Sequence, residues 1–220
     1  MNTISGSATQ ANTLFSKVSM LLTGSMAVAA LGTFMGAGIA GGALIGLIIL
    51  YLLATIGVVI AAKTAQPSVA VPLMFGWSFL SGLTVGPALN AYVHILGANT
   101  VMMAFLGTSG VMAVCGAVGM LSGINFSSMG RWLMLALFGL IIVGIIGIFV
   151  HMSAAVNMLY SGIGMLVFAG FFVFDFFRLK EENDDTWGSA IIISMNLHLD
   201  FVNFLLYLLQ FLAAGKDDRK

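Results

Sequence analysis

Long stretches of this chain carry no charged side chain. There are 45 consecutive uncharged residues between Lys17 and Lys63, and 67 between Lys63 and Arg131. A further 43 follow before the next charge, Asp175. A helix needs about 20 apolar residues to cross a bilayer, and a helix satisfies its own backbone hydrogen bonds there. Each of the three stretches therefore predicts two membrane-spanning helices.

A seventh apolar segment follows the polar turn at residues 178–186. Its length predicts a last span, although Asp200 near its centre leaves a re-entrant segment as the alternative. The expected helices are Val18–Met35, Ala43–Ala62, Val69–Leu89, Val101–Leu121, Trp132–Val150, Met158–Phe177 and Ser189–Leu212. We therefore predict an all-α, polytopic membrane bundle with one transmembrane domain at residues 18–213. A loose cytoplasmic tail (residues 1–17) and a polar tail (residues 214–220) would flank it.

Composition supports a lipid environment. The chain is 60% hydrophobic and 7% charged, whereas soluble proteins carry about 25% charged residues. The net charge is zero, and no basic run suggests a nucleic-acid partner. We expect the lipid bilayer, ions and other membrane proteins as partners.

The cations suggest an orientation, because Lys and Arg near helix ends favour the cytoplasmic side. In the predicted layout those before the last helix all fall on one side: Lys17, Lys63, Arg131, Arg178 and Lys180. We therefore expect a cytoplasmic amino terminus. The lack of long polar loops and of a transit peptide favours a bacterial inner membrane.

One row of small residues is expected to bring helices close together. Gly38, Gly42 and Gly46 recur every four residues at the start of the second expected helix. Small residues at this spacing let the backbones of membrane helices approach each other. We therefore predict a packing contact along this row.

All eight acidic residues lie at or after Asp175. Most of them fall in the last turn or the tail, where water solvates them. Asp175 and Asp200 are different because apolar residues surround each one in the sequence. An ionisable group at membrane depth is costly and usually marks a functional site facing the bundle interior.

A polar stripe runs along the last expected helix. Its members repeat at helical spacing and therefore share one face. They are Asn196, Asp200, Asn203, Tyr207 and Gln210. This stripe either faces a pore or forms a hydrogen-bonded seam between helices without any transport.

The two embedded aspartates are expected to meet. Antiparallel helices joined by a turn near Trp187 place Asp175 and Asp200 at similar heights. Two carboxylates about 4 Å apart repel by roughly 4 kcal/mol at an effective dielectric near 20. We therefore predict that the pair shares one proton and titrates as a unit. Lys63 or Arg178 could neutralise one member, unless Lys63 extends toward water instead.

The last hairpin resembles that of the transmembrane Bax inhibitor motif family. The resemblance rests on Phe174–Phe177, the acidic turn Asp184–Trp187 and the segment Asn196–Phe204. The segment Phe79–Pro87 is similar to the third helix of that family. The resemblance implies seven helices with the last one central, surrounded by the other six.

The resemblance also implies a pH-sensitive calcium leak in which an aspartate pair shares a proton and controls a pore. The family's aspartates match Asp175 and Asp200. In calcium-leaking bacterial members a basic residue after the second helix can latch onto the pair, and Lys63 is what this region offers. Some bacterial relatives are instead associated with a membrane-bound ATP-dependent protease.

Our leading hypothesis is a calcium leak gated by the aspartate pair. Calcium prefers oxygen ligands, and Asp175 and Asp200, with polar neighbours on the stripe, could bind it transiently. We expect no resident cofactor and no enzymatic activity. The alternative is a non-transporting protein that modulates a membrane protease or a stress response. An intramembrane aspartyl protease ranks lower, because neither aspartate has the flanking residues typical of such enzymes.

Overall fold

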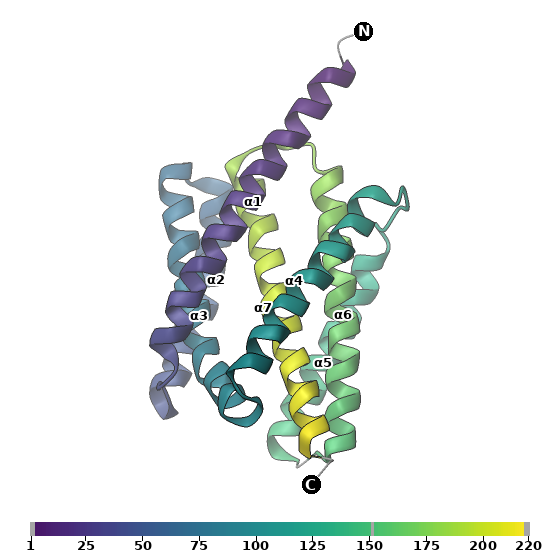
Figure 1. Cartoon of the computed structure of the whole chain (residues 1–220). Helices are drawn as coiled ribbons and strands as arrows, with labels where there is room; N and C mark the ends of the chain where they lie inside the picture. Colours follow the sequence, from purple (N-terminus) through teal and green to yellow (C-terminus); the bar gives the residue numbers. More distant parts are fainter. Residues whose placement is uncertain (1–2, 151, 218–220) are drawn as a thin grey trace. The chain divides into compact units, whose positions relative to one another are not determined.

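The structure is a computed structural model that describes residues 3–150 and 152–217, and it contains no β-strand within them. The helices are α1 (Thr3–Gly36), α2 (Gly41–Thr64), α3 (Pro67–Leu96), α4 (Ala98–Leu121), α5 (Met129–Phe149), α6 (Ala154–Glu181) and α7 (Trp187–Asp217) (Figure 1). These seven described helices are each long and apolar enough to cross a membrane. The predicted all-α fold is confirmed, and the last helix has the length of a full span, Trp187–Lys216.

The first helix begins earlier than predicted. The stretch expected to be a loose tail is helical from Thr3 onward, and the candidate span starts at Thr13. The reason is an apolar face that starts before Lys17: the side chains of Leu14 and Val18 are only 1% and 2% exposed. Counting uncharged residues from Lys17 missed this part of the face.

The last helix also extends past its predicted end. The polar tail was expected from residue 214, but α7 continues to Asp217. Residues 218–220 of that tail lie outside the described residues.

The chain divides into two compact units, and the single transmembrane domain stays a prediction. The first unit comprises Met1–Ala91 and Glu181–His198, and the second comprises Tyr92–Lys180 and Leu199–Lys220. Helix α7 contributes residues to both units. No linker or change in composition marks the division, so the sequence gives no sign of it.

In the first unit, glycines bring α1 and α3 into backbone contact. A Cβ atom on Gly82 of α3 would lie 2.0 Å from the carbonyl oxygen of Ala29 on α1. A Cβ atom on Gly32 of α1 would lie 2.3 Å from the carbonyl oxygen of Phe79. Close backbone approach of this kind replaces the hydrophobic effect as the source of helix association in lipid.

The predicted glycine contact on α2 was wrong. Among the described residues, nothing lies within 4 Å of a Cβ placed on Gly38, Gly42 or Gly46. Spacing identified a row of small residues, but spacing does not specify which row meets a neighbouring helix.

In the second unit, α6 packs antiparallel against the later part of α7. The rings of Phe172 and Phe204 are 5.8 Å apart, and those of Phe168 and Tyr207 are also 5.8 Å apart. The family resemblance implied an inner position for the last helix, and α7 is the most buried span. Its most apolar window is 56% buried, compared with 6% for α2 and for α5.

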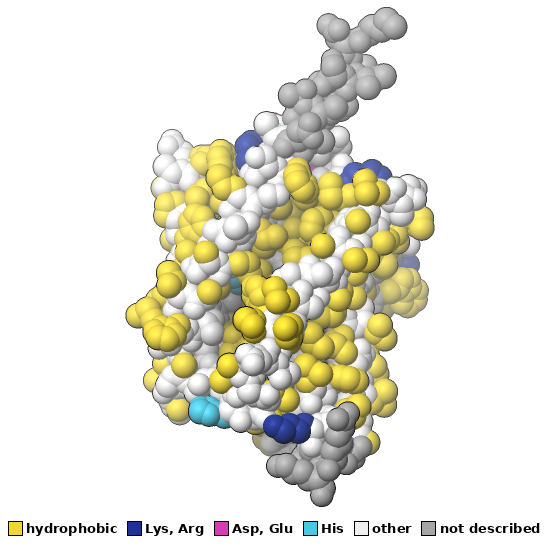
Figure 2. All heavy atoms as spheres, in the orientation of Figure 1, with side chains coloured by type: hydrophobic (Ala, Val, Ile, Leu, Met, Phe, Trp, Pro, Cys, Tyr) yellow, Lys and Arg dark blue, Asp and Glu magenta, His cyan; other side chains and the backbone are white. Residues whose placement is uncertain are grey.

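The surface is apolar. Large side chains such as Phe34, Leu121 and Phe149 are more than four-fifths exposed. Figure 2 shows that hydrophobic side chains cover much of the visible face and that charged side chains are few. Such a surface requires lipid as its solvent.

Candidate functional site

The two embedded aspartates come together inside the second unit. Asp175 lies on α6 and Asp200 lies on α7, and they are only 4% and 6% exposed. Their carboxyl groups lie close enough for the charge of Asp175 to act on Asp200. The two side chains therefore meet, as the antiparallel arrangement predicted. Their meeting follows from the antiparallel register, in which Phe172 of α6 also faces Phe204 of α7.

A hydrogen bond shared by the two carboxyl groups stays a prediction, and it would require a proton. An ionised carboxylate only accepts hydrogen bonds, so a hydrogen bond between two carboxyl groups needs one of them to be protonated. The Oδ2 atom of Asp200 is buried and has no hydrogen-bond partner among the described residues. A buried polar atom left without a partner costs about 1–3 kcal/mol. The pair is therefore a polar site that would gain from binding a proton or a cation.

Of the two predicted latch residues, Arg178 contacts an aspartate in the structure. It is one turn along α6 from Asp175, and its Nη1 atom donates to Asp175 Oδ1 over 3.5 Å. The Arg178 side chain is 43% exposed, so water screens the ion pair and its net contribution is about 1 kcal/mol or less. Arg178 can therefore neutralise Asp175 without holding it firmly.

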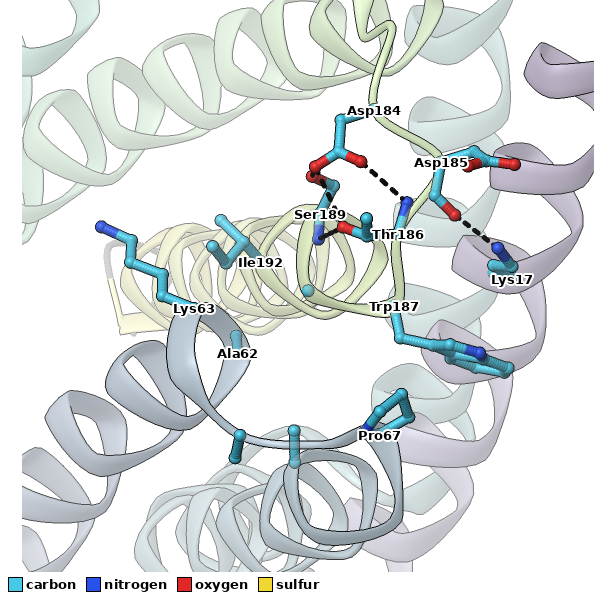
Figure 3. A pocket seen from close by; sticks show the side chains of 13 residues that line it. Lys17, Ala62, Lys63, Pro67, Asp184, Asp185, Thr186, Trp187, Ser189 and Ile192 are labelled. Carbon is cyan, nitrogen blue, oxygen red and sulfur yellow. Dashed lines mark hydrogen bonds between the residues drawn. The ribbon is translucent and has the colours of Figure 1, made fainter.

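Lys63, the other predicted latch residue, belongs to the first unit. It is exposed at the end of α2. There it lines a cavity of about 770 Å³ together with Lys17 and residues of the acidic turn (Figure 3). This exposed position agrees with the alternative in which Lys63 extends toward water.

The acidic turn organises the start of α7. Asp184 accepts hydrogen bonds from the hydroxyl groups of Ser189 (2.8 Å) and Thr186 (3.0 Å) and from the Thr186 backbone N–H (3.1 Å), as Figure 3 shows. These hydrogen bonds, with that from Ser189 the strongest influence, lower the pKa of Asp184. Lys17 adds a link from α1, because its ammonium group donates to the carbonyl of Asp185. These hydrogen bonds within the first unit therefore explain the polar residues of the turn by a structural role.

The polar stripe divides into separate environments. Tyr207 and Gln210 contact α6: the Tyr207 hydroxyl lies 3.1 Å from that of Tyr160, and the Gln210 amide donates to Asn157 over 3.5 Å. The Asn203 amide instead donates to the Leu199 carbonyl of its own helix. Asn196, the first member of the stripe, belongs to the first unit. The members of the stripe with a contact to α6 are thus Asp200, Tyr207 and Gln210.

His198 is a buried polar residue that the sequence analysis passed over. It is fully buried in the first unit, and its ring nitrogens lie 3.0 Å from the Ser25 hydroxyl and 3.1 Å from the Ser81 hydroxyl. Both ring nitrogens of His198 therefore have a hydroxyl partner, one on α1 and one on α3. The sequence does show isolated serines in apolar helices, which indicates a buried polar contact. It does not show which residue these serines bind.

The described residues contain no group of three or more His, Cys, Asp or Glu side chains placed to hold a metal ion. The predicted transient calcium ligands, Asp175 and Asp200, are therefore a pair of carboxyl groups, and any further ligands would have to be neutral oxygens.

Comparison with known proteins adds the family. A family model described as "Inhibitor of apoptosis-promoting Bax1" matches residues 11–217. The chain belongs to the Bax inhibitor family. The match covers both aspartates and nearly all of the described helices, in agreement with the resemblance of the last hairpin.

Several proteins are similar to this Bax inhibitor family member. An uncharacterized protein of Borreliella burgdorferi is 28% identical over 165 residues, which are 72% of this chain and 69% of that protein. The Golgi anti-apoptotic protein of vaccinia virus (strain Lister) is 33% identical over 65% of this chain and 57% of its own length. Bax inhibitor 1 of Schizosaccharomyces pombe is 31% identical over 64% of this chain and 50% of its own length. The chain thus matches only half to just over half of the two relatives that carry functional names.

Proposed function

We propose that this protein is a pH-sensitive calcium leak controlled by the Asp175 and Asp200 pair. The observation that carries the proposal is the pair itself. Two buried carboxyl groups lie within membrane-spanning helices and interact by charge, and one oxygen of Asp200 has no partner within the described part of the chain. An unsatisfied acidic site at membrane depth is a typical mark of an ion or proton pathway.

Loss of the shared proton would change two forces at once. The charge of the pair would rise from one negative unit to two, and carboxylates about 4 Å apart repel by roughly 4 kcal/mol at an effective dielectric near 20. The same change would strengthen the attraction of the site for a divalent cation. Proton binding would therefore control both the contact between α6 and α7 and the affinity for calcium.

The ligand set suits passage better than storage. Calcium takes about 6–8 oxygen ligands, whereas two carboxyl groups supply at most four. Water would complete the shell, so a bound ion could leave easily. In this proposal calcium and protons are transported or sensed, and the protein has neither a resident cofactor nor an enzymatic role.

The proposed location is a bacterial inner membrane with a cytoplasmic amino terminus. Two cations support this orientation: Lys17 lies near the start of the first candidate span, Thr13–Gly36, and Lys63 lies in the last turn of α2. Positively charged residues of short loops favour the cytoplasmic face.

A flux measurement tests the proposal. The protein is reconstituted in liposomes containing a calcium-sensitive dye, and calcium entry is recorded between about pH 6 and 8, the range into which burial can move a carboxyl group. We expect flux to vary with pH in the wild type and to lose that dependence in Asp200→Asn. Asp185→Asn is the matched control, because it removes one negative charge from the turn outside the membrane. Wild-type behaviour of Asp200→Asn would remove the pair from the mechanism.

A second candidate is a non-transporting regulator of a membrane-bound ATP-dependent protease or of a stress response. Two observations favour it: relatives carry the names Bax inhibitor 1 and Golgi anti-apoptotic protein, and the row Gly38, Gly42 and Gly46 has open space beside it among the described residues. A partner helix could pack there. This candidate predicts no calcium flux, and it predicts that Gly42→Leu releases a protease that co-purifies with the wild type.

A further inference from the structure

Another cavity lies in the second unit. It has a volume of about 310 Å³, and its walls come from α5, the residues before α6, α6 itself and α7. Gly144, Asn157, Tyr160 and Gln210 are among the residues that line it. Gln210 is ten residues after Asp200 on α7, so the cavity lies roughly 15 Å along that helix from the aspartate pair.

The polar atoms of this cavity are neutral. The Tyr160 hydroxyl donates to the Leu140 carbonyl over 3.0 Å, so the hydrogen bond between the two tyrosines is donated by Tyr207. The Asn157 amide donates to the Met152 carbonyl over 3.3 Å and accepts from Gln210. Amide and phenol oxygens are therefore available without any carboxylate in the described lining. Such oxygens stabilise a cation weakly, and the described lining has no positively charged side chain that would attract an anion.

Glycines shape the inner wall. A Cβ atom on Gly144 would lie 2.8 Å from the Tyr160 hydroxyl oxygen, and one on Gly164 would lie 2.5 Å from the Tyr207 ring. Both tyrosines therefore fit against helix backbones only because glycine stands opposite. Tyr160 lines the cavity, and its hydroxyl is hydrogen-bonded to that of Tyr207.

The size of the cavity suits a hydrated ion. Water occupies about 30 Å³ per molecule in the liquid, so the space holds about ten water molecules. A calcium ion with six to eight water ligands fits within it. A bare ion would find too few fixed oxygens.

An aromatic layer separates the cavity from the aspartate pair along α6 and α7. Tyr207 stacks on Phe168, and Phe172 packs against Phe204. The three phenylalanines are each less than 7% exposed. In this conformation the layer is therefore a dry barrier between the two polar sites.

We propose that this cavity is a vestibule that holds a hydrated cation before it reaches the aspartate pair, and that the Tyr160 and Tyr207 hydroxyl pair forms its inner door. The role of the vestibule in transport rests on the proposed calcium leak. Two physical properties of the vestibule, access to water and preference for cations, do not depend on the calcium leak.

Cysteine accessibility tests both properties. Gln210→Cys is made with the native Cys115 replaced by alanine, and the full-length protein in liposomes is exposed on both faces to charged methanethiosulfonate reagents. Leu209→Cys is the matched control, because Leu209 is the adjacent residue and is fully buried. Asn157→Cys supplies a second lining position on α6 in case one variant folds poorly.

We expect both lining cysteines to react more than about tenfold faster than Leu209→Cys, a tenfold rate ratio corresponding to about 1.4 kcal/mol of barrier. The trimethylammonium reagent should react several times faster than the sulfonate reagent, relative to their rates with free cysteine. Lining cysteines as slow as the control, or a preference for the sulfonate reagent, would overturn the proposal. If the expected reactivities appear while the wild type shows no calcium flux, the vestibule stands and the proposed leak fails.

Discussion

Replacing Gly164 with alanine is expected to open the inner door of the vestibule. The new Cβ atom would lie 2.5 Å from the Tyr207 ring, whereas carbon atoms in contact normally lie about 3.5–4.0 Å apart. The ring must therefore move by about 1 Å. The two tyrosine hydroxyls are 3.1 Å apart, and a shift of that size takes them beyond hydrogen-bond distance.

The energies determine the sign of the stability change. Overpacking costs about 1–3 kcal/mol, and a lost hydrogen bond costs about 0.5–1.5 kcal/mol. Alanine in place of glycine in a helix returns about 1 kcal/mol. The net loss for Gly164→Ala is therefore about 0.5–3.5 kcal/mol, and each kcal/mol corresponds to about 2–4 °C in melting temperature for a chain of this size.

Gly162→Ala is the control on the same helix. Its Cβ atom would lie 3.8 Å from the Phe211 ring, an ordinary contact, so the helix gains up to about 1 kcal/mol. Thermal unfolding in detergent and calcium flux in liposomes measure the two effects. Gly164→Ala should melt lower and leak faster than the wild type, and Gly162→Ala should melt slightly higher with unchanged flux. Equal melting temperatures and equal flux in the two variants would refute this account of the door.

Two further predictions concern the first unit. Gly82→Ala should lower the unfolding free energy by about 3 kcal/mol or more, because its Cβ atom would lie 2.0 Å from the Ala29 carbonyl oxygen. Gly76→Ala is the control: it has open space around it, so it should be neutral or stabilising by up to about 1 kcal/mol. Unfolding in detergent compares the two variants. Hydrogen bonds lower the pKa of Asp184, so the stability from its ionised form is complete above the ordinary value near 4 and is lost as the pH falls through the lower folded value. Asp184→Asn should therefore reduce the melting temperature at pH 7, and the difference from wild type should shrink as the pH falls through the lowered pKa of Asp184. A difference that stays the same in acid would contradict this interpretation.

The topology could be predicted from the sequence because the bilayer sets helix length. Counting uncharged residues between Lys17, Lys63 and Arg131 placed two helices in each interval, and the structure has two helices in each. Helix ends were less predictable. The apolar face of α1 starts at Leu14, before the charge that was used as its boundary.

The aspartate pair could also be predicted, because it depends only on the position of one turn. Antiparallel helices rise equally per residue, so residues at nearly the same distance from the turn meet, as Asp175 and Asp200 do. The partners of other residues depend on which helices are neighbours. That information was missing for His198, whose two hydrogen bonds go to α1 and α3, and for the glycine rows.

The arrangement of the second unit implies a closed conformation. The aspartate pair and the vestibule are both polar, yet the aromatic layer between them is dry, with Phe172 fully buried. A cation could cross that layer only if its rings moved, because no polar atom of the layer can replace water in the shell of the ion. The aromatic layer and the aspartate pair share the same two helices, α6 and α7. Any change in repulsion between Asp175 and Asp200 therefore acts directly on the contact between Phe172 and Phe204, one turn away. In the proposed leak, protonation and permeation would therefore be coupled through the interface between α6 and α7.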